Sequence, residues 1–410
     1  MKNNIKKNYI WNTIGALTIS LTSLFYTMIL SRFSDINSVG IFSFGFSFAC
    51  MMVTLASFGG RTYQVTDTKD EIKTSTYILT RYITVLVTFI LVIIFLLFKN
   101  YSTEKNIIIV LLCTFKFFEE ISDVYYGIIQ KKKKLYKVGI YQFVKSLINL
   151  LLFIISILII KKLIISVILI TINNIIFSLF LERNDAKKEK TWKLEIDKKE
   201  IIKLLKINLY ICLYTFLSAY LVSSPKYAID TYLTNEIQAI FNMLIMPATL
   251  MLLIGGFIIN PILVDIAEIY DKKEIKRLKI IIKKVIFLLF VLGLFGIIGT
   301  YLLGTNILGI IYGIDFSEYK IQLVIIIIGA TIYTLTTILG TIFITMRKIK
   351  IQVIIAIICS FFSYFISNVM VNKYGLDGGV YSYLFTMLFR FICYIPLLIN
   401  LRKEEAHEKN

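Results

Sequence analysis

The feature that most constrains this 410-residue sequence is a series of hydrophobic stretches, each about as long as a bilayer is thick. An α-helix rises about 1.5 Å per residue and the hydrocarbon core is about 30 Å thick, so roughly 20 apolar residues make one crossing. The sequence therefore predicts an all-α polytopic membrane protein with about 12 transmembrane helices. We expect crossings at residues 11–30, 37–60, 78–98, 107–130, 138–160, 163–181, 201–222, 238–262, 282–303, 321–345, 351–371 and 379–400.

Basic residues alternate between the gaps that separate these stretches. Every second gap carries a lysine- or arginine-rich cluster, such as the run from Lys131 to Lys134. Short cytoplasmic loops are enriched in Lys and Arg, so we expect a cell (plasma or inner) membrane protein with both termini cytoplasmic and an even number of crossings. The opposite set of gaps holds only isolated cations, namely Arg32, Lys99, Lys105, Lys161, Lys162, Lys226, Lys320 and Lys373.

The net charge of +19 does not indicate a nucleic-acid partner, because the positive-inside distribution already accounts for most basic residues. The five cysteines each fall inside a predicted helix without paired spacing, and the single histidine is His407 in the tail. Neither a disulfide framework nor a metal site is indicated, and no cofactor is expected.

The longest polar interval, from Glu182 to Glu200, falls after the sixth predicted crossing. We interpret it as a solvated cytoplasmic linker at residues 182–200, between an N-terminal six-helix lobe at 1–181 and a C-terminal six-helix lobe at 201–401. Residues 402–410 then form a cytoplasmic tail. A faint internal repeat, residues 36–43 against 235–242, supports duplication with both copies in the same direction.

The fourth predicted crossing carries four ionisable residues: Lys116, Glu119, Glu120 and Asp123. Spacings of three, four and seven residues put three of them on one helix face, with Glu119 at its edge. Ionisable groups inside a membrane helix cost roughly 2.5–3.5 kcal/mol each on insertion scales, so this face is not expected to contact lipid.

Depth along the helices suggests partners for these charges. Asp123 lies about seven residues, or ~10 Å, from the cytoplasmic end of its helix, and Lys145 lies at a similar height on the next one. We expect a structural salt bridge between them, with coupling or gating as the alternative role. Lys116 and Glu120, four residues apart, are expected to neutralise one another. Glu119 would then be unpaired and a candidate for proton or sodium binding.

Three segments carry a family resemblance: Phe115 to Gln130 with the basic run after it, Ser31 to Gly40, and Ser224 to Tyr227 followed by Ile259 to Pro261. Together with the helix count they resemble the Wzx-like polysaccharide-repeat flippases of the multidrug/oligosaccharidyl-lipid/polysaccharide exporter superfamily. The resemblance implies two six-helix bundles around a central cavity that opens alternately to each side. It also implies movement of undecaprenyl pyrophosphate-linked oligosaccharide repeat units from the inner to the outer leaflet, for capsule, exopolysaccharide or O-antigen assembly.

The expected partners are the lipid-linked oligosaccharide, membrane lipids, and the polysaccharide polymerase with its chain-length machinery. A pyrophosphate requires fixed positive charge and several donors. Arg390, near the middle of the last crossing, is the foremost candidate. The alternative interpretation of Arg32 and Lys226 is that they anchor their helices at the membrane interface. The alternative for Arg61 is that it is an ordinary cation at the cytoplasmic end of a helix. The expected cationic cavity comprises Arg390, Arg32, Arg61, Lys226 and Lys116.

No catalytic motif occurs in the sequence, so an enzyme is not expected. The longest predicted outer loop, about residues 304–320, contains only Asp315 and Glu318 as acids, which disfavours a polymerase or glycosyltransferase. A multidrug or other small-molecule exporter of the same superfamily stays open as the other alternative. Transport would draw on a gradient or on the membrane potential, which supplies ~2.3 kcal/mol per charge per 100 mV.

Overall fold

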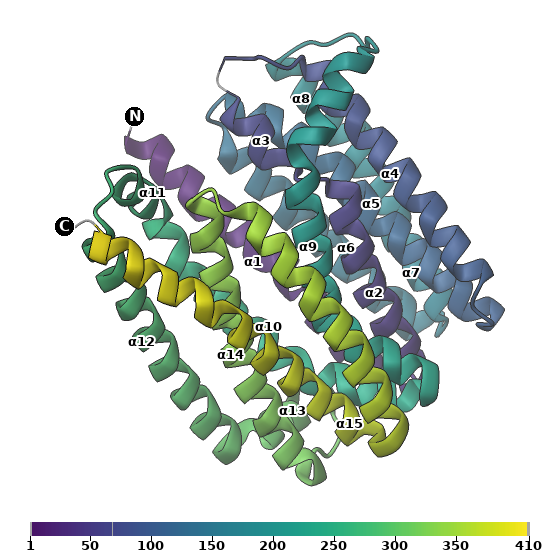
Figure 1. Ribbon diagram of the computed structural model, residues 1–410. Helices are drawn as coiled ribbons and strands as arrows, with labels where there is room; N and C mark the ends of the chain where they lie inside the picture. The colour runs from purple at the N-terminus through teal and green to yellow at the C-terminus, as the bar shows by residue number, and fades with distance from the viewer. Residues whose placement is uncertain (1, 68, 408–410) are drawn as a thin grey trace. The chain divides into compact units, whose positions relative to one another are not determined.

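The computed structural model describes residues 2–67 and 69–407, and within them all regular structure is helical (Figure 1). The last residues of the expected tail, 408–410, lie outside the described residues. Two compact units are present, Met1–Ala219 (unit 1) and Tyr220–Asn410 (unit 2). Helix α9 (Lys198–Tyr232) begins in unit 1 and ends in unit 2.

The predicted fold class is confirmed in the described residues. Ten helical segments are long and apolar enough to cross a membrane, and each coincides with a predicted crossing. One of the ten, α15 (Ile349–His407), holds two predicted crossings, because Gly375 breaks it with φ 58° and ψ −131°. The twelfth crossing is α5 (Thr103–Lys131). It is not among the ten apolar segments because it carries four charged residues in its interior.

Helix α5 is at the centre of unit 1. The remaining elements are α1 (Lys2–Phe33), α2 (Ile36–Ser57), α3 (Gly60–Thr66), α4 (Thr74–Leu97), α6 (Leu135–Ile159), α7 (Leu163–Ile176), a π-helical segment (Phe177–Glu182) and α8 (Arg183–Glu189). Helix α5 packs against α2, α3, α4, α6, α7 and α8. The apolar core of the unit includes Ile121, Tyr125 and Ile129 from α5.

Unit 2 has an apolar core to which the last part of α9 contributes Leu221 and α14 contributes Leu339 and Phe343. Helix α14 packs against both α10 and α15. The elements of this unit are α10 (Asn235–Ile259), a 3₁₀ turn (Asn260–Ile262), α11 (Leu263–Asp271), α12 (Ile275–Gly299), a π-helical segment (Thr300–Gly304), α13 (Thr305–Tyr312), a 3₁₀ turn (Ser317–Tyr319), α14 (Lys320–Thr345) and α15.

Local sequence signals set several helix ends in unit 1. Asp35 caps α2 by accepting hydrogen bonds from the backbone N–H of Ser38 at 2.8 Å and from its hydroxyl at 2.7 Å. Helix α2 stops at Phe58 and Gly59, which are both left-handed, with φ of 45° and 74°. This turn starts the short helix α3, which begins where the predicted crossing at residues 37–60 ends.

Close packing of α1 against α6 depends on two glycines. A methyl group added to Gly15 would lie 2.7 Å from the carbonyl oxygen of Gly139, and one added to Gly139 would overlap the backbone of Trp11. Since membrane helices associate through close backbone approach, these positions define how the two helices meet.

The segment between the sixth and seventh crossings is more ordered than a solvated linker. Residues 177–189 continue α7 as a π-helical segment and then as α8. Glu182 and Ala186 are fully buried, so this part of the expected linker packs within unit 1. The physical reason is that both side chains have partners there: Ala186 joins the apolar core, and Glu182 meets a buried lysine.

Candidate functional site

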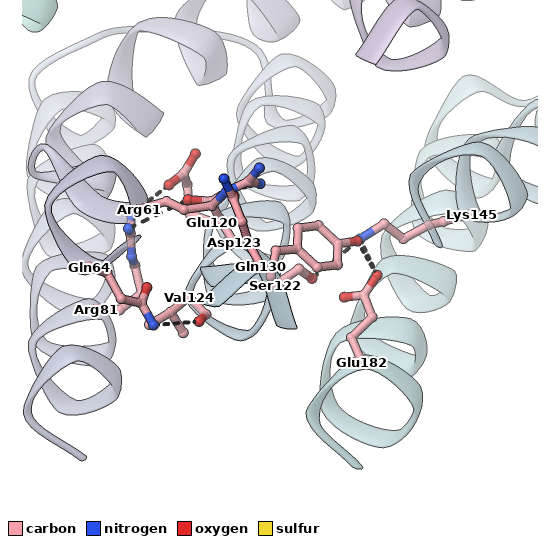
Figure 2. Close-up of polar contacts among 11 residues, drawn as sticks. Arg61, Gln64, Arg81, Glu120, Ser122, Asp123, Val124, Gln130, Lys145 and Glu182 are labelled. Carbon is pink, nitrogen blue, oxygen red and sulfur yellow. Dashed lines mark hydrogen bonds and ion pairs between the residues drawn. The ribbon is translucent and has the colours of Figure 1, made fainter. Parts of the chain in front are cut away.

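Helix α5 presents its polar side chains on two different sides. Glu120 and Asp123 lie one turn apart and approach α3 and α4, whereas Ser122 and Tyr126 point toward α6 and the end of α7. Figure 2 shows the two groups on opposite sides of the helix. The spacing explains the split, because residues three or four apart share a face while residues two apart do not.

The first group is a four-charge cluster of Arg61, Arg81, Glu120 and Asp123 (Figure 2). Arg61 Nη1 lies 3.1 Å from Asp123 Oδ1, and Arg81 Nη1 lies 2.6 Å from Glu120 Oε2. Arg81 Nη2 is also 3.9 Å from Asp123 Oδ2, so Asp123 lies between both arginines. The cluster is formally neutral and joins α3, α4 and α5.

Burial differs across the four-charge cluster. The Arg81 side chain is 4% exposed, whereas those of Arg61 and Asp123 are 23% and 26% exposed. Arg81 also donates to the carbonyl oxygen of Ala56 at 3.3 Å, near the end of α2. Arg61 Nε donates to Gln130 Oε1 at 2.8 Å. Arg81 is thus a buried centre of the cluster and Arg61 its more accessible member.

Two glycines allow α3 to lie where the cluster requires it. A methyl group on Gly60 would overlap the guanidinium of Arg81, and one on Gly127 would overlap the amide of Gln64. Gln64 in turn donates to the carbonyl oxygen of Val124 at 3.0 Å (Figure 2). Helix α3 is therefore held against both α4 and α5 at close range.

The second group is a buried ion pair. Lys145 Nζ lies 2.9 Å from Glu182 Oε1, with side-chain exposures of 4% and 0%. Lys145 also donates to Ser122 Oγ and to the Tyr126 hydroxyl, each at 3.3 Å, and the Tyr126 hydroxyl donates to Glu182. Glu182 is the last residue of the π-helical segment, a rare geometry that shifts the side-chain register of the helix after it.

The structure corrects two expected pairings and the expectation that Glu119 is unpaired. Asp123 pairs with Arg61 and Lys145 with Glu182, so the expected Asp123–Lys145 bridge is wrong. Lys116 Nζ binds Glu119 Oε2 at 2.8 Å, so the expected Lys116–Glu120 pair is wrong and Glu119 has a partner. The error between helices has one cause. Helical spacing determines which residues share a face, but the rotation of α5 among its neighbours decides which partner each one meets.

Two residues of these networks, Arg81 and Glu182, were not predicted from the sequence. Arg81 lies three residues inside the predicted crossing at 78–98, where it reads as an ordinary cytoplasmic-end cation. Glu182 was the first residue of the expected linker. The signal that could have identified Arg81 is the same one used for α5, an ionisable residue inside a membrane helix, which requires a partner.

In unit 2, Arg390 on α15 is 2% exposed. Its guanidinium carbon lies 5.4 Å from the centre of the Tyr333 ring, and Nη1 donates to Thr337 Oγ1 at 3.5 Å. Both partners are on α14. The contact with the ring is a cation–π interaction, which strengthens when the cation is removed from water.

The remaining expected cations have different surroundings. Lys116 is buried, and its Nζ lies 4.8 Å from the centre of the Phe46 ring. Arg32 is exposed at the last turn of α1, and Lys226 is half-buried beside Pro225 in α9. Unit 1 thus brings together Arg61, Glu120 and Asp123 but holds Lys145 in a separate network. Among the residues described, no group of three His, Cys, Asp or Glu side chains is arranged to hold a metal ion.

Within the described residues, the ten long apolar helices of the two units, together with the charged helix α5, define a multi-pass membrane protein with ion pairs held between its helices. The chain belongs to the polysaccharide biosynthesis protein family, whose model matches residues 5–242. It is 24% identical over 396 residues to the capsular polysaccharide biosynthesis protein CapF of Staphylococcus aureus, covering 95% of this chain and 98% of that protein.

Solved structures show the same fold. The lipid II flippase MurJ in an inward closed conformation matches with a TM-score of 0.73 and 14% identity, over 97% of this chain and 90% of that one. A multidrug resistance MATE transporter of the MOP superfamily in its inward-facing conformation matches with a TM-score of 0.60 and 13% identity, over 98% and 95% of the two chains.

Proposed function

We propose that the protein is a flippase that moves lipid-linked oligosaccharide repeat units, carried on undecaprenyl pyrophosphate, from the inner to the outer leaflet for assembly of a capsule-type polymer. The observation that carries the proposal is the combination of family and fold. A near full-length likeness to a capsular polysaccharide biosynthesis protein coincides with the fold of a lipid II flippase. The membrane fold supplies a route across the bilayer, and the family supplies the polymer class.

Alternating access between the N-terminal and C-terminal six-helix lobes expected from the sequence is the mechanism we propose, with both termini in the cytoplasm. The basic residues that follow α5 and α11 support this orientation, because cytoplasmic loops collect Lys and Arg. An outward-moving pyrophosphate would gain ~2.3 kcal/mol per charge per 100 mV across an inside-negative membrane. The membrane potential is therefore a sufficient energy source in principle, without a nucleotide.

Arg390 is the cation we propose for direct contact with the pyrophosphate. It is a buried cation near the middle of the last crossing, and its guanidinium lies over the face of the Tyr333 ring and donates to Thr337 Oγ1. Arg32, Lys226 and Lys116 are proposed as further cations along the path. Arg61 is proposed to exchange Asp123 for a phosphate oxygen, because it is the more accessible arginine of the four-charge cluster. Such an exchange would couple substrate binding to the position of α3.

Glu119, Glu120, Asp123 and Lys145 are proposed as coupling or gating residues rather than as substrate ligands. Each is engaged with an opposite charge in the structure, so a change of partner would have to accompany any movement of its helix. The Lys145–Glu182 pair is buried, so α6 could move away from the end of α7 only if each charge met a new partner.

Reconstitution tests the proposal. The purified protein in proteoliposomes should deliver a fluorescent lipid-linked oligosaccharide to the outer leaflet, measured by its accessibility to an added lectin. Protein-free vesicles are the control for spontaneous movement. Efflux of cationic dyes without movement of the lipid-linked oligosaccharide would replace the proposal with the multidrug exporter alternative, and polymer formation from the substrate would replace it with a polymerase.

A further inference from the structure

A pocket of about 260 Å³ lies in unit 1, and none of the residues of the four-charge cluster lines it. It is lined by residues of α3, the start of α4, the end of α5 and the residue that follows α8. Three lysines line it, Lys131, Lys132 and Lys190, together with one acid, Asp70, and the polar side chains of Gln64 and Thr74. Three cations and one anion give the lining a formal charge of +2.

Asp70 occupies a defined position between two of these lysines. Lys131 Nζ lies 2.7 Å from Asp70 Oδ1, and Lys190 Nζ lies 3.0 Å from Asp70 Oδ2. Each carboxylate oxygen therefore accepts from a different ammonium group. Hydrogen bonds from Lys131 and Lys190 lower the pKa of Asp70, so the carboxylate stays charged.

The backbone of Asp70 is left-handed, with φ of 50°. Asp tolerates this region better than most residues, and the conformation places its carboxylate at the pocket rather than along a regular helix. Asp70 is the one acid in a basic pocket, and its two oxygens each accept from a different lysine. It thus takes the position that an anionic ligand would take.

A phosphate group suits this pocket better than a carboxylate does. It carries more negative charge and three acceptor oxygens, so it can engage the third lysine, Lys132, as well. Lysine ammonium groups act as compact point charges that bind phosphate from several directions. The volume exceeds that of a single water site many times over, so a phosphate with its attached group has room.

We propose that this pocket is a phosphate-binding site and that Asp70 is its internal competing anion. The phosphate comes either from the headgroup of an anionic membrane lipid or from free phosphate in solution. The lining of this site includes none of the cations proposed above to contact the transported pyrophosphate, and its existence does not depend on the proposed flippase activity.

Binding to the purified full-length protein tests the site. Inorganic phosphate and pyrophosphate are titrated by calorimetry at low salt into the wild type, D70N, K131Q and K190Q. D70N removes a negative charge that repels phosphate, so it should bind phosphate roughly fivefold more tightly than the wild type. Each lysine change removes a positive charge and should weaken binding by a similar factor. Raising the salt should weaken binding in every variant, because the groups are partly exposed.

Two control variants make the same kind of substitution at residues that do not line the pocket. Glu71 is in the same loop as Asp70 and pairs with Lys203 at 3.9 Å, so E71Q should bind phosphate as the wild type does. Lys188 is exposed on α8 and does not line the pocket, so K188Q should also be neutral. Melting temperatures establish that each variant is folded, and K131R provides a lysine-site variant that keeps the charge.

A second arm identifies the source of the phosphate. Amine-reactive labelling of Lys131 and Lys190 is compared in vesicles of phosphatidylcholine alone and of phosphatidylcholine with phosphatidylglycerol. If phosphatidylglycerol protects these lysines from labelling, and protects them more in D70N, the site binds a lipid headgroup. If phosphate binds in the calorimetric experiment, the site binds free phosphate. If both arms show no binding, or if D70N binds no tighter than E71Q, the proposal is overturned.

Discussion

Lys145 on α6 and Glu182 at the end of the π-helical segment lie 2.9 Å apart inside unit 1, where both side chains are almost inaccessible. The residues are 37 positions apart in sequence, and their ion pair joins α6 to the segment that continues α7. A buried pair of this kind is held less by its own attraction than by the cost of leaving either partner alone.

We predict that Lys145→Gln and Glu182→Gln each reduce the stability of the protein by about 3–5 kcal/mol, because each leaves an uncompensated buried charge. The double variant should recover much of the loss, since both charges are then absent. The yield of monodisperse protein and its melting temperature measure both effects. Asp123→Asn combined with Lys145→Gln is the control, and it should show additive losses because these residues belong to different networks.

Within the four-charge cluster, Arg81→Gln should be more damaging than Arg61→Gln. Arg81 is the buried member and contacts Glu120, Asp123 and the end of α2, whereas Arg61 is partly exposed and can be replaced by water. Adding Glu120→Gln to Arg81→Gln should restore folded protein. Equal melting temperatures for the two arginine variants would contradict the central position of Arg81.

Gly139→Ala should disturb the contact between α1 and α6, because the new methyl group would overlap the backbone of Trp11, which cannot move aside as a side chain can. Overpacking of this kind typically costs about 1–3 kcal/mol. Gly299→Ala is a suitable control, since within the described residues no heavy atom outside its own helical turns lies within 4 Å of the added methyl group. The difference in melting temperature between the two variants is the measurement, and it should vanish if α1 and α6 are not packed at this glycine.

Arg390→Ala should abolish delivery of lipid-linked oligosaccharide at near-normal expression, and Arg390→Lys should keep part of the activity with weaker substrate binding. The charge survives in lysine, but the bidentate geometry of the guanidinium does not. The proteoliposome assay measures both variants. Wild-type transport by Arg390→Ala would move the binding role to Arg32, Arg61 or Lys226, and loss of folded protein would show that Arg390 is structural.

Cysteine labelling tests the proposed orientation. In a background without the five native cysteines, single cysteines at Lys132, Lys188, Lys273 and Lys348 should react from the cytoplasmic side. Cysteines at Asn100, Thr234 and Asp315 should react from outside. Labelling of Lys188 from outside would overturn the orientation, because it would place the segment between the sixth and seventh crossings on the wrong side.

The sequence by itself determined the number and position of the crossings. Apolar length specifies a membrane helix almost independently of its neighbours, so residues 11–30 and 379–400 could be assigned as securely as those between them. It also identified α5 as a helix that cannot face lipid, because its charges share the helical period. Neither inference requires knowledge of which helices are adjacent.

Only the tertiary structure decided which charges meet. The left-handed turn at Phe58 and Gly59 brings Arg61 back onto α5, and the π-helical segment turns Glu182 inward to Lys145. Both depend on backbone departures from regular helix that apolar periodicity does not record. A charge inside a membrane helix predicts that a partner exists. Which residue is that partner depends on how the helix is rotated and which helices pack against it, and only the tertiary structure shows this.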